Sequence, residues 1–72
     1  MSPKYPLLPS GKIVAALKRG GFIEVSQKGS HLKLSRGGRA AIVPLHDEVA
    51  RGTLKSILEQ AGLDLDEFVN LL

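Results

Sequence analysis

The chain has 72 residues, of which 43% are hydrophobic and 24% charged, and it contains no cysteine. This length and composition are typical of one small folded domain, and the lack of cysteine excludes disulfides, thiolate zinc sites and cysteine nucleophiles. No charge-free stretch exceeds seven residues, far short of the roughly 18 apolar residues of a membrane span. We therefore expect a single soluble, cytoplasmic domain over residues 1–72.

The net charge of +3 is unevenly distributed along the chain. Residues 1–39 hold eight basic side chains and one acidic side chain, whereas residues 40–72 hold two basic and six acidic ones. A basic half suits a polyanionic partner such as nucleic acid, because each neutralised phosphate releases counterions. The alternative is ordinary surface charge that aids solubility.

The first predicted element is a helix over residues 11–19. Residues 1–9 contain three prolines and predict an extended lead-in. Ser10 is a candidate N-cap, and the helix has an apolar stripe that Gly20-Gly21 ends. The stripe consists of Ile13, Ala16 and Leu17.

A β-hairpin follows, because residues 22–28 and 31–35 both alternate between apolar and polar side chains around Gly29-Ser30. A two-residue turn pairs Lys28 with His31, Ser26 with Lys33 and Glu24 with Ser35. In that register Ile23 and Val25 share the buried face with Leu32 and Leu34, and Val25 lies opposite Leu34.

The remainder of the chain predicts a third strand and two helices. Residues 40–44 form a strand after the Gly37-Gly38 turn, with Ala41 and Val43 inward, Ile42 outward and Pro44 at its end. A loop over 45–50 contains His46. A helix from Gly52 to Ala61 ends at Gly62, and Asp64 with Glu67 predicts a capping box that opens a short final helix. This last helix offers Phe68, Leu71 and Leu72 for packing.

The predicted fold class is α+β, with the order α-β-β-β-α and a short extra C-terminal helix. Helices cover one face of a three-stranded antiparallel sheet and leave the other face open. We expect that open face to carry Glu24, Ser26, Lys28, His31, Lys33 and Ser35.

Most catalytic signatures are absent from the sequence. It has no phosphate-binding Gly-Lys-Ser loop and no dinucleotide fingerprint. A metal site would need His31, His46 and scattered carboxylates, so we expect no metal or other cofactor. His31 lies among lysines on a polar face, where an imidazole suits acid–base chemistry on a phosphodiester. The simpler interpretation, which the residues alone favour, is a solvated strand histidine, and His46 has the same interpretation as a loop residue.

The sequence resembles the HicA family of toxin–antitoxin mRNA interferases over nearly its whole length. The most specific part is the Gly-Ser-His hairpin followed by Pro-x-His and Gly-Thr-Leu. The matching segments are Ser10-Gly11, Leu17-x-x-x-Gly21-Phe22, Gln27-Lys28-Gly29-Ser30-His31, Val43-Pro44-x-His46, Gly52-Thr53-Leu54-x-x-Ile57-Leu58, Ala61-Gly62 and Glu67-Phe68. The resemblance implies a fold like that of double-stranded-RNA-binding domains, endoribonuclease action on mRNA that inhibits translation, and neutralisation by a HicB-type antitoxin. It also implies that His31 is the catalytic histidine.

We therefore expect a metal-independent endoribonuclease in which His31 is general acid or base. The expected RNA contacts near it come from Lys28, Gly29, Ser30 and Lys33, and further contacts to the RNA backbone from Lys12, Lys18, Arg19, Arg36 and Arg39. The second proton-transfer group is left open between a lysine, water and His46. The chain is expected to be a monomer alone and a hetero-oligomer with its antitoxin. The alternatives are a non-catalytic RNA-binding module of the same fold and a pure protein-interaction subunit.

Overall fold

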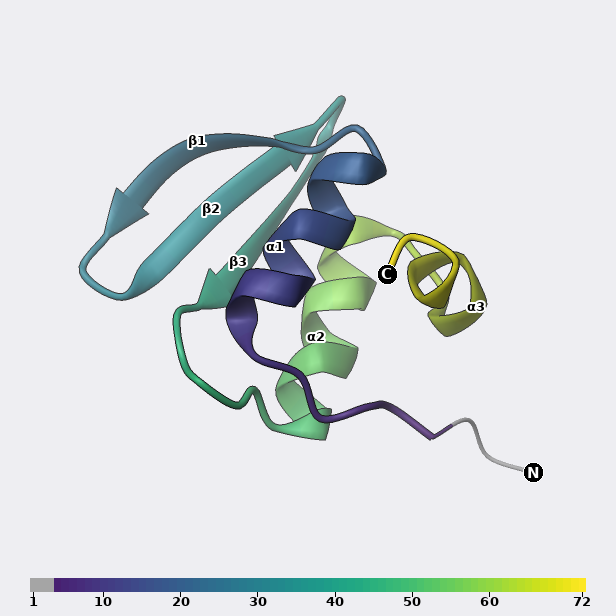
Figure 1. Cartoon of the computed structure of the whole chain (residues 1–72). Coiled ribbons are helices and arrows are strands. Elements are labelled where there is room, and N and C mark those ends of the chain that lie inside the picture. Colours follow the sequence, from purple (N-terminus) through teal and green to yellow (C-terminus); the bar gives the residue numbers. More distant parts are fainter. Residues whose placement is uncertain (1–3) are drawn as a thin grey trace.

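A computed structural model describes residues 4–72 of the chain. Its elements are α1 (Ser10–Arg19), β1 (Ile23–Lys28), β2 (His31–Arg36), β3 (Arg39–Pro44), α2 (Arg51–Ala61) and α3 (Leu65–Val69) (Figure 1). The predicted α+β class and element order are confirmed. Of the predicted lead-in, residues 1–3 lie outside the described residues, and residues 4–9 form no helix. Leu8 makes an isolated antiparallel bridge with Val49.

The start of α1 differs from the prediction, whereas its end agrees. Pro9 is the N-cap and Ser10 is the first helical residue, buried, so the N-cap assignment of Ser10 is wrong. The helix ends because Gly21 adopts a φ of +95°. Its N–H donates to the carbonyl of Lys18, and the N–H of Phe22 donates to that of Leu17, both at 3.0 Å. These two bonds form the glycine-terminated Schellman motif.

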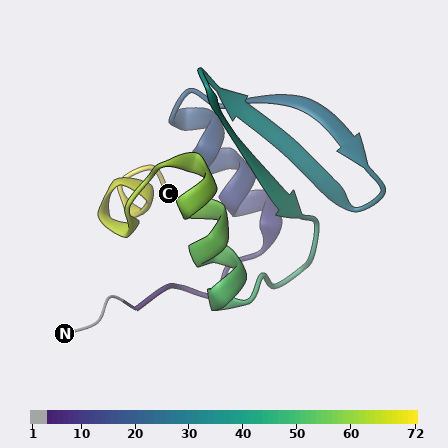
Figure 2. The same cartoon turned by 180° about the vertical axis from the view of Figure 1, so that it is seen from behind.

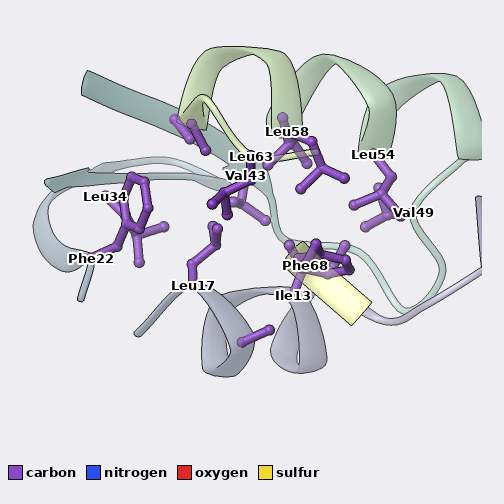
Figure 3. Packing of buried hydrophobic residues seen from close by; sticks show 14 of the residues in the cluster. Ile13, Leu17, Phe22, Leu34, Val43, Val49, Leu54, Leu58, Leu63 and Phe68 are labelled. Atoms are coloured by element: carbon purple, nitrogen blue, oxygen red, sulfur yellow. The ribbon is translucent and has the colours of Figure 1, made fainter. Parts of the chain in front are cut away.

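One apolar core lies between the sheet and the helices, as Figure 3 shows. α1 and α2 both contact β3, and α3 adds Phe68, which is fully buried. The other large, fully buried side chains are Ile13, Leu17, Phe22, Leu34, Val43, Val49, Leu54 and Ile57. Because these residues come from every helix and from β2 and β3, the core fixes how the helices lie against the sheet.

The C-terminal predictions are confirmed except that α2 begins at Arg51 and that Leu72 is 47% exposed and not packed. Gly62 ends α2 with a φ of +73°. Asp64 caps α3: its carboxylate accepts from the N–H of Glu67 at 2.8 Å, and the Glu67 carboxylate accepts from the N–H of Asp64 at 3.1 Å. No helix among residues 4–72 is long and apolar enough to cross a membrane.

The sheet is antiparallel, with the order β1-β2-β3. β2 and β3 pair as predicted, so Ala41 and Val43 are buried and Ile42 points outward. β1 and β2 begin as predicted, with Lys28 opposite His31 and Ser26 opposite Lys33. A β-bulge between Glu24 and Ser26 then shifts the register.

The bulge overturns three predicted positions in β1. Glu24 lies opposite Leu34 and Ile23 opposite Ser35, and Val25 has no partner in β2. Ile23 and Val25 are 63% and 47% exposed instead of buried. Ile23 is exposed because the shifted register places it opposite Ser35, on the open face. All of β1 is exposed, and the hairpin extends beyond the helices in both views (Figures 1 and 2).

Glu24 also changes face because of this shift. Paired with the inward-facing Leu34, it lies on the helix side of the sheet, where its carboxylate forms an ion pair with Lys18 of α1. The expectation that Glu24 lies on the open face is therefore wrong.

Candidate active site

The open face is the side of the sheet that the helices leave uncovered (Figure 2). The register arranges its side chains in three rows across β1, β2 and β3, since paired residues lie on the same side of a sheet. The rows are Lys28–His31–Pro44, Ser26–Lys33–Ile42 and Ile23–Ser35–Ala40. Every titratable group in these rows is a histidine or a lysine, so the open face is basic.

His31 is the first residue of β2 and is exposed on this face. Lys28 lies directly opposite it on β1, at a distance typical of cross-strand neighbours, about 4.5–5.5 Å between Cβ atoms. Lys33 lies on the same side two residues further along β2, because side chains alternate along a strand. The imidazole therefore lies on a solvent-accessible surface, with lysines at two neighbouring positions of the same face.

Backbone contacts hold the turn that precedes His31. Gly29 adopts a φ of +59°, which the tight turn requires and which a side chain would disfavour. The amide of Gln27 donates to the Gly29 carbonyl at 3.0 Å, and the N–H of Leu45 donates to the Ser30 carbonyl at 2.7 Å. The turn is thus supported by its own strand and by the loop after β3.

The predicted contacts on α1 do not share a surface with His31. Lys18 is paired with Glu24 on the helix side of the sheet. Lys12 and Arg19 line a shallow groove of about 220 Å³ together with Leu8, Ala15 and Leu72. Arg19 also donates from Nη1 to the carbonyl of Leu71 at 2.8 Å, which ties the C-terminus to α1.

Arg36 and Arg39 lie at the other end of β2 and β3, about 16 Å from His31 at the usual rise of a strand. The Arg36 guanidinium is 4.8 Å from the centre of the Phe22 ring and donates to the Gly20 carbonyl at 2.6 Å. Arg39 lies against Gly62, where an added Cβ would be 2.7 Å from its Cδ. Both arginines therefore have structural contacts with the helix layer.

The structure adds two apolar side chains to the site that sequence reasoning did not connect with it. Pro44 lies opposite His31, and Ile42, which is 38% exposed, lies opposite Lys33. The outward prediction for Ile42 was the available signal, but the pairing that brings it beside Lys33 depends on the strand register. Among residues 4–72, no three histidine or acidic side chains gather into a group that could hold a metal ion.

One comparison with known families found a match. A family model described as the HicA toxin of bacterial toxin–antitoxin systems matches residues 10–63, which include the whole sheet and the loop after β3. No curated protein matches the chain.

Proposed function

The chain belongs to the HicA toxin family of bacterial toxin–antitoxin systems, and from this premise we propose that it is an endoribonuclease that cleaves mRNA and so inhibits translation. The observation that carries the proposal is the exposed His31 on a basic, uncovered sheet face. A surface of this kind accepts an RNA strand, because phosphates are attracted by lysines and the reacting group is open to solvent.

The 2′-hydroxyl of the RNA is the nucleophile in this mechanism, so the protein needs no nucleophile of its own. His31 transfers a proton, and Lys28 and Lys33 bind the scissile phosphate and stabilise the charge that develops on its oxygens. The Ser30 hydroxyl and the N–H groups of the Gly29-Ser30 turn are supporting donors. Because these groups together bind the phosphate and move the proton, we propose cleavage that does not depend on a metal ion.

The test compares wild type with His31→Ala on the same RNA in the presence of EDTA. Loss of a general acid or base lowers the rate by about 10²- to 10⁴-fold, and this is the expected result. Ser35→Ala is the matched control, because Ser35 lies on the same strand and the same face. Cleavage that survives His31→Ala contradicts the catalytic role. RNA binding without cleavage by either protein favours the non-catalytic RNA-binding module.

A toxin of this family acts together with an antitoxin partner, and we propose a HicB-type protein that covers the open face. An acidic surface complements the lysines and excludes RNA at the same time. Co-expression of a neighbouring antitoxin reading frame is expected to relieve growth arrest. Lys28→Glu together with Lys33→Glu is expected to weaken the complex, measured by co-purification, and unchanged co-purification would place the antitoxin elsewhere.

A further inference from the structure

His46 is the second histidine of the chain, and the structure brings it to the same end of the sheet as His31. His31 pairs with Pro44. The contact between β2 and β3 continues one residue further, where the N–H of Leu45 donates to the carbonyl of Ser30 at 2.7 Å. His46 is the next residue, two positions beyond the residue that pairs with His31.

The position of His46 is held by its backbone and not by its side chain. Its N–H donates to the Pro44 carbonyl at 3.1 Å, and its carbonyl accepts from the N–H of Ser10 at 3.0 Å. The side chain is exposed and makes no hydrogen bond or ion pair with the described residues 4–72. The loop thus carries an exposed second imidazole with no side-chain partner among residues 4–72, two residues beyond the β3 partner of His31.

Cleavage of RNA by its own 2′-hydroxyl requires two proton transfers. A base removes the proton of the 2′-hydroxyl, and an acid protonates the leaving 5′-oxygen. One imidazole cannot do both in the same step. If His31 is one of these groups, the other must approach the same phosphate from a nearby position.

We propose that His46 is the general acid of the reaction and His31 its general base, an inference that rests on the proposed endoribonuclease function. The assignment rests on position: His31 lies on the open face beside the two lysines, and His46 lies in the loop just after β3, the strand that pairs with His31.

In the proposed step the 2′-oxygen forms a bond to phosphorus as the bond between phosphorus and the 5′-oxygen breaks. The proton of the 2′-hydroxyl goes to neutral His31, and the proton of the His46 imidazolium goes to the 5′-oxygen. The products are a 2′,3′-cyclic phosphate and a 5′-hydroxyl. Proton exchange with water then restores both imidazoles, so the step needs no further reactant.

The experiment uses an RNA oligonucleotide whose scissile linkage carries sulfur in place of the bridging 5′-oxygen. A thiolate leaves without protonation, because a thiol is far more acidic than an alcohol, with a pKa of about 8.5. His46→Ala is expected to slow cleavage of the oxygen linkage by about 10²-fold or more and that of the sulfur linkage by less than about tenfold. His31→Ala is expected to slow both, since the base is needed for either linkage.

Two variants separate catalysis from structure. His46→Gln keeps polar character but cannot transfer a proton, and the backbone hydrogen bonds at this position do not depend on the side chain. Glu48→Ala, at an exposed position in the same loop, is expected to cleave both linkages at the wild-type rate. Full activity of His46→Ala on the oxygen linkage, or an equal loss on both linkages, overturns the role of His46. Failure of wild type to cleave either linkage overturns the endoribonuclease function together with this inference.

Discussion

Replacement of Lys28 and Lys33 by alanine tests whether the open face binds RNA. For single strands, the logarithm of the affinity falls with the logarithm of the salt concentration by about 0.7 for each neutralised phosphate. If each lysine neutralises one phosphate, the double variant loses about 1.4 from this slope. When the salt concentration rises fourfold, one such contact lowers the RNA affinity by about 2.6-fold. Two contacts together lower it by about sevenfold.

The assay measures fluorescence anisotropy of a labelled single-stranded RNA with protein that carries His31→Ala, so that the strand is not cleaved. The salt concentration runs from about 50 to about 200 mM, the range over which phosphate contacts change affinity strongly. The matched control is Lys4→Ala with Lys55→Ala, two exposed lysines that lie outside the sheet. It removes the same charge and is expected to leave the slope nearly unchanged. Equal slopes for both double variants, or a smaller slope only in the control, would refute binding through the open face.

Three further predictions concern stability, each measured by urea or thermal unfolding. Phe68→Ala removes a fully buried ring and is expected to lower the free energy of unfolding by about 3–5 kcal/mol. Leu72→Ala, at a residue 47% exposed, is expected to lower it little. Similar losses for the two variants would contradict the assigned core. Asp64→Ala is expected to cost about 1 kcal/mol, and its effect should shrink once Glu67 is already alanine, because the two side chains form one capping box; full additivity would count against that box. Gly62→Ala is expected to lower the free energy of unfolding by about 1–2 kcal/mol, because Gly62 has a left-handed backbone conformation. Gly52→Ala, where an added Cβ meets nothing within 4 Å, is expected to raise it by about 0.4–1 kcal/mol. The opposite order would refute the backbone argument.

Local patterns determine much of this fold, which is why the sequence predicts it. The helix over 51–61 follows from an apolar repeat that ends at a glycine, and the turn at Gly37-Gly38 fixes the pairing of β2 with β3. In both regions one face is buried, so a shift of one residue would expose the core. His31 falls in such a region, and for this reason its exposure on the open face also follows from alternation.

β1 could not be predicted in the same way, because it lacks that constraint. Alternation predicts burial of Ile23 and Val25, but a buried face requires a helix to cover it, and the hairpin extends beyond the helices (Figure 1). The contact between the loop before His46 and the turn before His31 was equally hidden from the sequence. It depends on the hydrogen bonds of Leu45 and Ser10, and no periodic pattern encodes contacts of this kind in a loop.

The bulge in β1 has a consequence for the charge of the open face. With strict alternation, Glu24 would lie opposite Ser35, on the same side as His31 and Lys33, and its carboxylate would repel RNA. The shift at Val25 turns Glu24 to the helix side, where Lys18 neutralises it. Glu24 is the only acidic residue before position 40, so this one irregularity leaves the three rows around His31 without a carboxylate. A bulge costs pairing in an edge strand, and here the loss coincides with a surface better suited to a polyanion.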